Sequence, residues 1–258
     1  ISIPNHTQEW LDNFIDIARS VHANLEDIDR AESIVNMAWS SSVELNKYSG
    51  CITCAEAMID LIRNNEIARE IYSKTIDIIL NDSDIENDDN ITLAFINCAK
   101  SICTNLNDKK WSMELLKQAE ELAENSISLI EIGEVVHNNY FLDDQVKAKE
   151  VFIKAVNLAT SEDIVDDNIS YILRDLADDI ILSEDENGYA DKTWAREVYE
   201  LALNKARIVS NRTDSFYPLR DLGLSAGEEN KLNDKEWAIE ILVESIIIAQ
   251  KNKIDILV

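Results

Sequence analysis

A short motif returns six times along this chain, and its regular return limits the fold more than any other feature. The three clearest copies read Asp108-Lys-Lys-Trp-Ser112, Asp191-Lys-Thr-Trp-Ala195 and Asp234-Lys-Glu-Trp-Ala238. Three weaker copies keep the small residue that closes the motif. The six small residues are Ala31, Ala68, Ser112, Ala148, Ala195 and Ala238. Their spacings of 37, 44, 36, 47 and 43 residues lie in the range of helical repeat proteins.

The residues that follow each small residue have helical periodicity. A large residue stands four positions later, and a small or short residue stands seven and, in most copies, eleven positions later. These offsets share one face of an α-helix. We name this predicted helix the B helix of each repeat. We expect the Asp that opens each Lys-x-Trp copy to cap it, because Asp is a favoured N-cap.

A second motif lies 13 to 18 residues before each B motif. It places large residues four and one positions before a small residue and, in most copies, three after it, which is again one helical face. The six small residues of this A helix are Ala18, Ala55, Ala99, Gly133, Ala177 and Gly223. The sequence therefore predicts one domain of six antiparallel helix pairs over residues 1–258. The predicted repeats span roughly 8–45, 46–82, 88–126, 127–161, 167–210 and 214–250, with 251–258 as a C-terminal tail or cap.

The chain is poor in the two residues that turns need most. It contains 5 Gly and 2 Pro in 258 residues, against roughly 18 and 13 at average usage. Strand-and-turn architectures place these residues at their corners. We therefore expect an all-α fold, and we expect the six helix pairs to need few special backbone angles.

The paired motifs resemble the tetratricopeptide repeat, in which Ala, an aromatic residue and a second Ala mark helix B, as Ala195, Tyr199 and Ala202 do here. The Asp-Lys-x-Trp-Ala opening is also similar to the Sel1-type repeat. The resemblance covers residues 8–250, with a period of 36–47 residues instead of about 34 and without the closing Pro. It implies an α-solenoid that forms a right-handed superhelix and binds proteins or peptides on a concave face lined by A helices.

The resemblance also implies partner-binding residues on the A helices. Positions three before and one after the small residue are expected to face the concave surface, and tyrosines stand six before it in the fifth and sixth repeats. Arg offers a bidentate fork and Tyr a flat hydrogen-bonding platform, so the fifth and sixth repeats are expected to clamp a carboxylate or an acidic peptide. Alternatively, both arginines pair with the chain's own Asp175, Asp178 or Asp221. The candidate residues are Tyr171, Arg174, Asp178, Tyr217, Arg220, Ile96, Ile130, Lys100 and Glu134.

Charge narrows the class of partner. The chain has 24 Lys and Arg against 50 Asp and Glu, a net charge of −26. Nucleic-acid binding and docking on anionic membranes both rely on clustered Lys and Arg, so we expect neither. Acidic residues are concentrated in 77–89 and 162–191. These two segments are either solvated loops or a surface that recognises a basic partner. The main hypothesis is a non-enzymatic interaction scaffold. The alternative is an acidic immunity or inhibitor protein that neutralises a cationic toxin, nuclease or nucleic-acid-binding protein.

Other sites receive little support from the sequence. Cys51, Cys54 and Cys98 occupy core positions of the A motif, which favours buried thiols over metal or redox chemistry. The three His are far apart, and we expect no catalytic residue, cofactor or metal. The final B helix is apolar nearly all round, so the C-terminal tail or a second copy in a homodimer is expected to cover it. No apolar run approaches the roughly 20 residues needed to span a membrane. We expect a cytoplasmic protein with a trimmed or processed N-terminus.

Overall fold

A computed structural model describes residues 8–45, 47–81, 88–161, 167–182 and 188–251. Over these ranges the chain forms twelve α-helices and one π-helical turn, and it contains no strand. The helices divide into two compact units. One comprises 1–124 with 134–145, and the other comprises 125–133 with 146–258. The expectation of an all-α fold is therefore confirmed.

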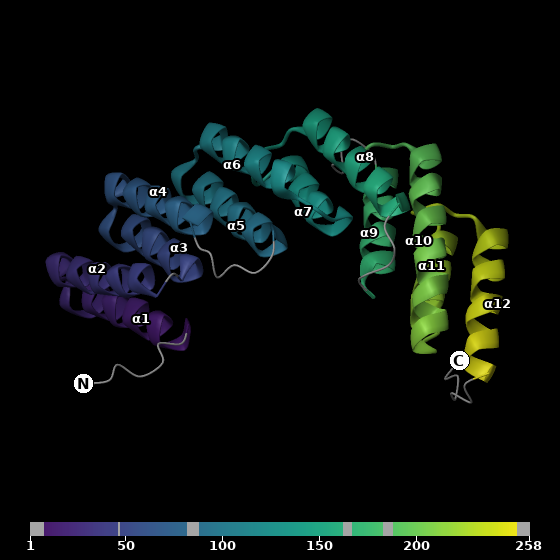
Figure 1. Cartoon of the computed structure of the whole chain (residues 1–258), viewed down its shortest axis with the longest axis horizontal. Coiled ribbons are helices and arrows are strands. Elements are labelled where there is room, and N and C mark those ends of the chain that lie inside the picture. The colour runs from purple at the N-terminus through teal and green to yellow at the C-terminus, as the bar shows by residue number, and fades with distance from the viewer. Residues whose placement is uncertain (1–7, 46, 82–87, 162–166, 183–187, 252–258) are drawn as a thin grey trace. The chain divides into compact units, whose positions relative to one another are not determined.

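The first unit contains three helix pairs. Its helices are α1 (Gln8–Leu25), α2 (Ile28–Glu44), α3 (Tyr48–Ala57) with its π-helical extension η1 (Met58–Ile62), α4 (Asn65–Asn81), α5 (Asp88–Leu106) and α6 (Lys109–Leu122). Within each pair the two helices pack together, and the B helices α2 and α4 also pack against the next A helices, α3 and α5 (Figure 1). The A helices α1, α3 and α5 contact one another in sequence.

The second unit repeats this arrangement. Its helices are α8 (Gln145–Ser161), α9 (Ile169–Ile181), α10 (Lys192–Thr213), α11 (Tyr217–Gly227) and α12 (Lys235–Lys251). Helix α7 (Ser126–His137) contributes residues to both units. The pairs α9–α10 and α11–α12 pack internally, while α10 and α9 both contact α11. Six predicted A helices and six predicted B helices are thus present in the predicted order.

The small residues of the motifs lie where helices pack most closely. All twelve are buried. A Cβ at Gly133 would lie 2.4 Å from the Phe152 ring, and one at Gly223 would lie 2.9 Å from Leu242 Cγ. Phe152 and Leu242 are the large residues four positions after the small residue of their B helices. At Gly133 and Gly223, the lack of a side chain therefore leaves room for the large B-helix residue of the same pair.

Every turn from helix A to helix B uses the same backbone device. One residue adopts the left-handed conformation, with φ between 51° and 58°, and an Asp or Asn follows it directly. The six left-handed residues are Glu26, Arg63, Asn107, Asp143, Ala190 and Asn233. The side chains of Asp27, Asn64, Asp108, Asp191 and Asp234 each accept a hydrogen bond from the backbone N–H three residues later. The expectation that these pairs need few special backbone angles is wrong, since each turn has one and none is Gly.

The burial of side chains bears on two expectations, one about the cysteines and one about the last helix. All four cysteines are buried free thiols, as expected for core residues. On α12, the side chains of Ile239, Val243 and Ile247 are 61%, 48% and 58% exposed. The tail expected to cover this helix, 252–258, lies outside the described residues, and the homodimer stays a prediction. None of the helices described combines the length and the apolarity needed to cross a membrane.

Candidate functional site

Three ionic contacts join successive repeats at the start of the B helices. The residue just after the small residue of one B helix is a cation, and it reaches the capping Asp and the Trp of the next B helix. Arg196 Nη1 lies 2.5 Å from Asp234 Oδ2, with its guanidinium 3.7 Å from the Trp237 ring centre. The equivalent sets are Arg69 with Asp108 and Trp111, and Lys149 with Asp191 and Trp194. We call these three sets the inter-repeat clamps.

The clamps explain why Asp and Trp recur together in the motif. Each Asp serves two partners, because it caps its own helix and pairs with the cation of the preceding repeat. The backbone N–H of Trp237, and then Arg196, hold the pKa of Asp234 below its usual value. The Trp ring supplies a face for the same cation. Sequence analysis found the cap and missed the partner, although the cations at 69, 149 and 196 share one repeat position.

A buried tyrosine links the A helices of the second and third repeats. The hydroxyl of Tyr72 on α4 lies 2.6 Å from Ser101 Oγ on α5, and Ser101 Oγ donates to Glu56 Oε1 on α3 at 2.6 Å. Asn105 Nδ2 donates to Ser101 Oγ at 3.1 Å. Burial raises the pKa of Tyr72 to about 12, so the hydroxyl stays protonated. Three helices therefore share one hydrogen-bonded network.

The fifth and sixth repeats contain the same network. The Tyr199 hydroxyl on α10 donates to Asp178 on α9 and lies 3.0 Å from Ser225 Oγ on α11. Ser225 Oγ donates to both carboxylate oxygens of Asp178, at 2.9 and 2.8 Å. Lys231 Nζ completes the network at 2.9 Å from Asp178 Oδ2. Burial, followed by the bond to Asp178, raises the pKa of Tyr199.

The two networks use identical repeat positions. The acid stands one after the A-helix small residue, the Tyr four after the B-helix small residue, and the Ser two after the next A-helix small residue. Tyr occupies its position only in the two repeats where the acid and the Ser are also present. We call the sets Glu56–Tyr72–Ser101 and Asp178–Tyr199–Ser225 the tyrosine networks. They fix the side chains that border the A-helix surface.

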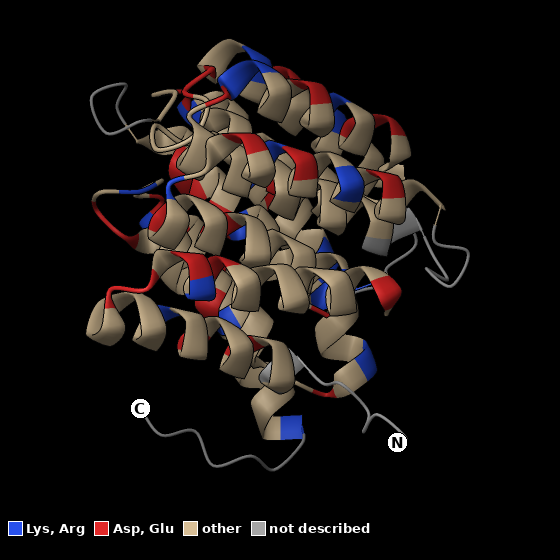
Figure 2. Cartoon of the chain, turned by 90° about the vertical axis from the view of Figure 1, so that its left-hand side faces the viewer, with Lys and Arg blue, Asp and Glu red and all other residues tan. Residues whose placement is uncertain are grey.

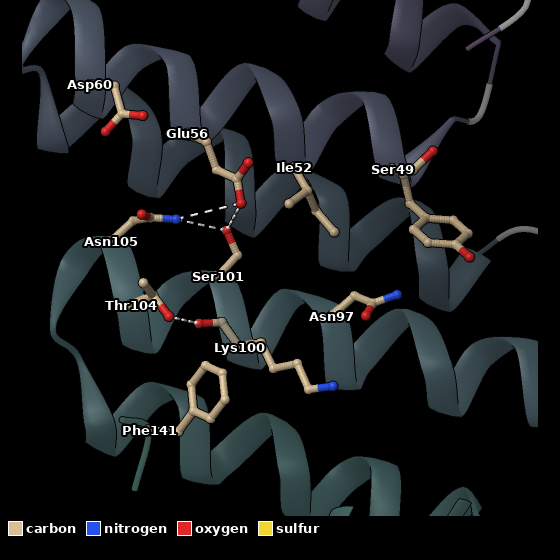
Figure 3. A pocket seen from close by; sticks show the side chains of 11 residues that line it. Ser49, Ile52, Glu56, Asp60, Asn97, Lys100, Ser101, Thr104, Asn105 and Phe141 are labelled. Carbon is tan, nitrogen blue, oxygen red and sulfur yellow. Dashed lines mark hydrogen bonds between the residues drawn. The ribbon is translucent and has the colours of Figure 1, made fainter. Parts of the chain in front are cut away.

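A cleft of about 530 Å³ opens on this surface between α3 and α5. Figure 3 shows its side chains: Ile52 and Glu56 project from α3 and Asp60 from η1, and Lys100 projects from α5. Phe141, from the segment after α7, closes one side. Polar groups between them include Ser49, Asn97, Thr104 and Asn105. The cleft thus combines the apolar side chains of Ile52 and Phe141 with hydrogen-bonding groups and charges of both signs.

A second cleft, of about 570 Å³, lies between the B helices α2 and α4. Trp39, Val43 and Lys74 are among its lining residues. It belongs to the opposite members of the first two helix pairs and contains no residue of the A-helix rows. Its residues therefore provide matched controls for the cleft between α3 and α5.

The structure brings four of the predicted residues together on α9 and α11. The Arg174 guanidinium lies 5.4 Å from the Tyr171 ring centre, and that of Arg220 lies 4.7 Å from the Tyr217 ring centre. Helices α9 and α11 are in contact, and burial, followed by the charge of Asp221, raises the pKa of Tyr171. Arg174 donates to Asp175 and Arg220 donates to Asp221. The alternative of intramolecular pairing therefore describes both arginines.

The other predicted residues have different surroundings. Lys100 lines the α3–α5 cleft, and its partner-binding role stays a prediction. Asp178 is engaged in its tyrosine network. Glu134 is exposed. Ile96 and Ile130 are 0% and 1% exposed, so the structure places both in the core and not on a binding surface. Sequence reasoning also overlooked Asp60 and Phe141, which belong to η1 and to an irregular segment.

Charged residues of both signs lie along many of the helices (Figure 2). The segments expected to concentrate acids, 77–89 and 162–191, fall partly outside the described residues. No protein-family model and no curated protein sequence matches the chain.

Proposed function

We propose that this chain is a protein-interaction scaffold, an α-solenoid of tetratricopeptide-like helix pairs that binds partner segments along its A helices. The cleft between α3 and α5 carries the proposal. Its residues Ile52, Glu56 and Lys100 belong to the two A-helix positions at which we expect partner binding, and all three line the cleft. The tyrosine network holds Glu56 in place, so the surface is formed before a partner arrives.

The size and chemistry of the cleft suit an extended peptide. A volume of about 530 Å³ accommodates a few side chains and is within the range of ligand sites. Half-buried Ile52 and Phe141 can receive an apolar side chain. The amides of Asn97 and Asn105 can bond the backbone of a bound segment, since an amide side chain both donates and accepts. Peptide recognition commonly combines such backbone bonds with an apolar side-chain pocket.

Selection from a random peptide library tests this proposal without a known partner. We expect peptides to be enriched on the wild-type chain and to lose at least tenfold in affinity on Ile52→Asp, which places a charge in the apolar part of the cleft. The matched control is Val43→Asp in the cleft between α2 and α4, which is also half-buried. Selected peptides should bind this control as they bind the wild type. Equal binding to Ile52→Asp, or equal loss on both variants, would refute the A-helix cleft.

The predicted surface on α9 and α11 is a weaker candidate. An acidic segment would have to displace Asp175 from Arg174 and Asp221 from Arg220. Replacing two intramolecular ion pairs by two pairs with the bound segment, at partly exposed sites, adds little net affinity. Replacement of Tyr171, Arg174, Tyr217 and Arg220 by Ala together is therefore expected to leave peptide binding at the α3–α5 cleft unchanged. A loss of binding in the quadruple variant would move the proposed site to these helices.

The inhibitor hypothesis depends on the net charge of −26. It makes a different prediction about salt, because association driven by an acidic surface weakens steeply as ionic strength rises. Binding centred on Ile52 and Phe141 changes far less. Affinities of the selected peptides at about 0.05 and 0.5 M salt, where the Debye length falls from roughly 14 to 4 Å, separate the two. A steep decline that is insensitive to Ile52→Asp would favour the inhibitor.

A further inference from the structure

The cleft between α3 and α5 has charge polarity, and we propose that it selects a partner segment with a basic and an acidic residue on either side of an apolar one. The basic side chain would lie beside Asp60, the acidic one beside Lys100, and the apolar one against Ile52 and Phe141. This inference depends on the proposed function, because it assigns the class of peptide that the same cleft binds.

The two opposite charges of the cleft, Asp60 and Lys100, do not form an ion pair with each other. Asp60 and Lys100 both line it, yet neither forms an ion pair within the residues that the structure describes. In Figure 3 the Lys100 side chain extends away from Asp60, toward the part of the cleft where Asn97 lies. Other cations of the same unit, such as Arg69, are by contrast paired with an acid. Asp60 and Lys100 are therefore available to a ligand.

The tyrosine network explains why Glu56 does not neutralise Lys100. Glu56 and Lys100 occupy the same position of neighbouring A helices, one after the small residue. Ser101 Oγ, itself 2.6 Å from the Tyr72 hydroxyl, holds Glu56 Oε1 at 2.6 Å. Asn105 Nδ2 approaches the same oxygen at 3.5 Å. Figure 3 shows that both contacts are made by one oxygen of the carboxylate, which lies between Asp60 and Ile52 and is engaged by Ser101 and Asn105.

The π-helical turn η1 gives Asp60 its place on the cleft. In a regular α-helix, residues spaced by four drift around the axis, since four residues exceed one 3.6-residue turn. A π-helical turn is wider, because its hydrogen bonds span five residues, so each residue advances through a smaller angle. The turn at Met58–Ile62 therefore offsets the drift that builds up from Ile52 to Glu56. Isolated π-helical turns occur frequently at functional sites.

The spacing of the charges defines the partner segment. Ile52 and Asp60 are eight residues apart, which is at most about 12 Å along the helix axis at the α-helical rise of 1.5 Å per residue. Lys100 extends toward the Ile52 end. An extended peptide covers 12 Å in three to four residues at about 3.3 Å each. The occupant we infer is thus an extended segment of a partner protein whose basic and acidic residues stand three or four positions apart.

A charge-exchange experiment tests the polarity. Peptides are first selected on the wild-type chain, and the basic and acidic residues of a selected peptide are then exchanged. In the protein, the double variant Asp60→Lys with Lys100→Glu reverses the cleft and leaves the net charge unchanged. We expect the exchanged peptide to bind the wild type about tenfold more weakly, since two attractive contacts become repulsive. We expect the double variant to restore its affinity and to lose the original peptide.

The controls separate this inference from the proposed function. Lys74→Glu changes a cation of the cleft between α2 and α4 and should leave both peptides unaffected. Circular dichroism of the double variant checks that its helices are retained. If no peptide is enriched, or if binding survives Ile52→Asp, the proposed function fails. If binding requires Ile52 but the exchanged peptide binds the wild type as well as the original does, only the charge polarity is overturned.

Discussion

Removal of the Tyr199 hydroxyl should destabilise the second unit more than removal of the Tyr72 hydroxyl destabilises the first. Both side chains are fully buried, and Tyr→Phe keeps their volume. The Tyr199 hydroxyl donates directly to the Asp178 carboxylate, whereas Tyr72 contacts Glu56 only through Ser101. Hydrogen bonds to charged groups contribute about 1.5–3 kcal/mol, and neutral ones about 0.5–1.5 kcal/mol.

The remaining contacts of each network set the size of the loss. In Tyr199→Phe, Asp178 keeps Ser225 at 2.8 Å and Lys231 at 2.9 Å, so no buried charge loses all its partners. We therefore expect the free energy of local unfolding to fall by about 2 kcal/mol, toward the lower part of the charged range. In Tyr72→Phe, Ser101 keeps Glu56 and Asn105, and we expect a fall of about 1 kcal/mol.

Hydrogen exchange measured by mass spectrometry suits a chain with two units, because it reports local opening instead of one global transition. The lowered protection should appear in α9, α10 and α11 for Tyr199→Phe and in α3, α4 and α5 for Tyr72→Phe. Tyr140→Phe is the control, since Tyr140 is 85% exposed. The reasoning is refuted if Tyr199→Phe costs no more than Tyr72→Phe, or no more than the control.

Four further predictions follow from the clamps, the turns and the buried titratable groups. Arg196→Ala should lower the protection of α12 from hydrogen exchange by about 1–2 kcal/mol, since it removes an ion pair and a cation–π contact. The control Arg19→Ala, which removes an exposed pair with Asp16, should change the protection little. Arg63→Gly should increase the free energy of unfolding by about 0.5–1 kcal/mol and so raise the midpoint of urea unfolding, because Gly adopts a φ of 58° without the Cβ penalty. Asn107→Gly should increase it less, since Asn tolerates this conformation. A thiol reagent at pH 8 should label the cysteines only as fast as the chain opens, because burial raises the pKa of Cys54 and of Cys98 to about 12; rapid labelling of the folded chain would contradict this. Finally, the contribution of Tyr72 to stability should be complete below pH 10 and be lost between pH 10 and about 12, because its folded pKa is raised, and the alkaline decline should be shallower in Tyr72→Phe.

The repeat pattern predicted the helices and their buried faces because packing within a pair depends on side-chain size alone. The same pattern misplaced part of the A-helix surface. The position three before the small residue lies only about 60° from it around the helix, at 100° per residue. It therefore stands at the edge of the buried stripe, where the neighbouring helix decides its exposure. Ile96 is buried there, whereas Ile52 is half exposed and lines a cleft.

Contacts between repeats were harder to predict, because they join residues that are separated by roughly 40 positions in the sequence. Each of these residues is also of a common type, so none of them marks the contact by itself. Ile17 illustrates the same limit. It occupies a core position of the A motif but is 51% exposed, since no described helix precedes α1. The left-handed turn residues were missed because only Asn107, Asp143 and Asn233 are types that favour this conformation. The π-helical turn that positions Asp60 leaves no mark in the pattern of apolar residues.

The inter-repeat clamps have a direction, and this direction provides a rule for building longer proteins from these repeats. The cation always belongs to the upstream repeat, and the Asp and Trp always belong to the downstream one. A copy of a repeat that opens with Asp-Lys-x-Trp therefore gains its clamp only behind a B helix that offers Arg or Lys. On α12 this position is Ile239, so Ile239→Arg is the change that would prepare the array for an added module. Assemblies of chosen length, each adding a cleft of chosen charge, could then be designed from this one chain.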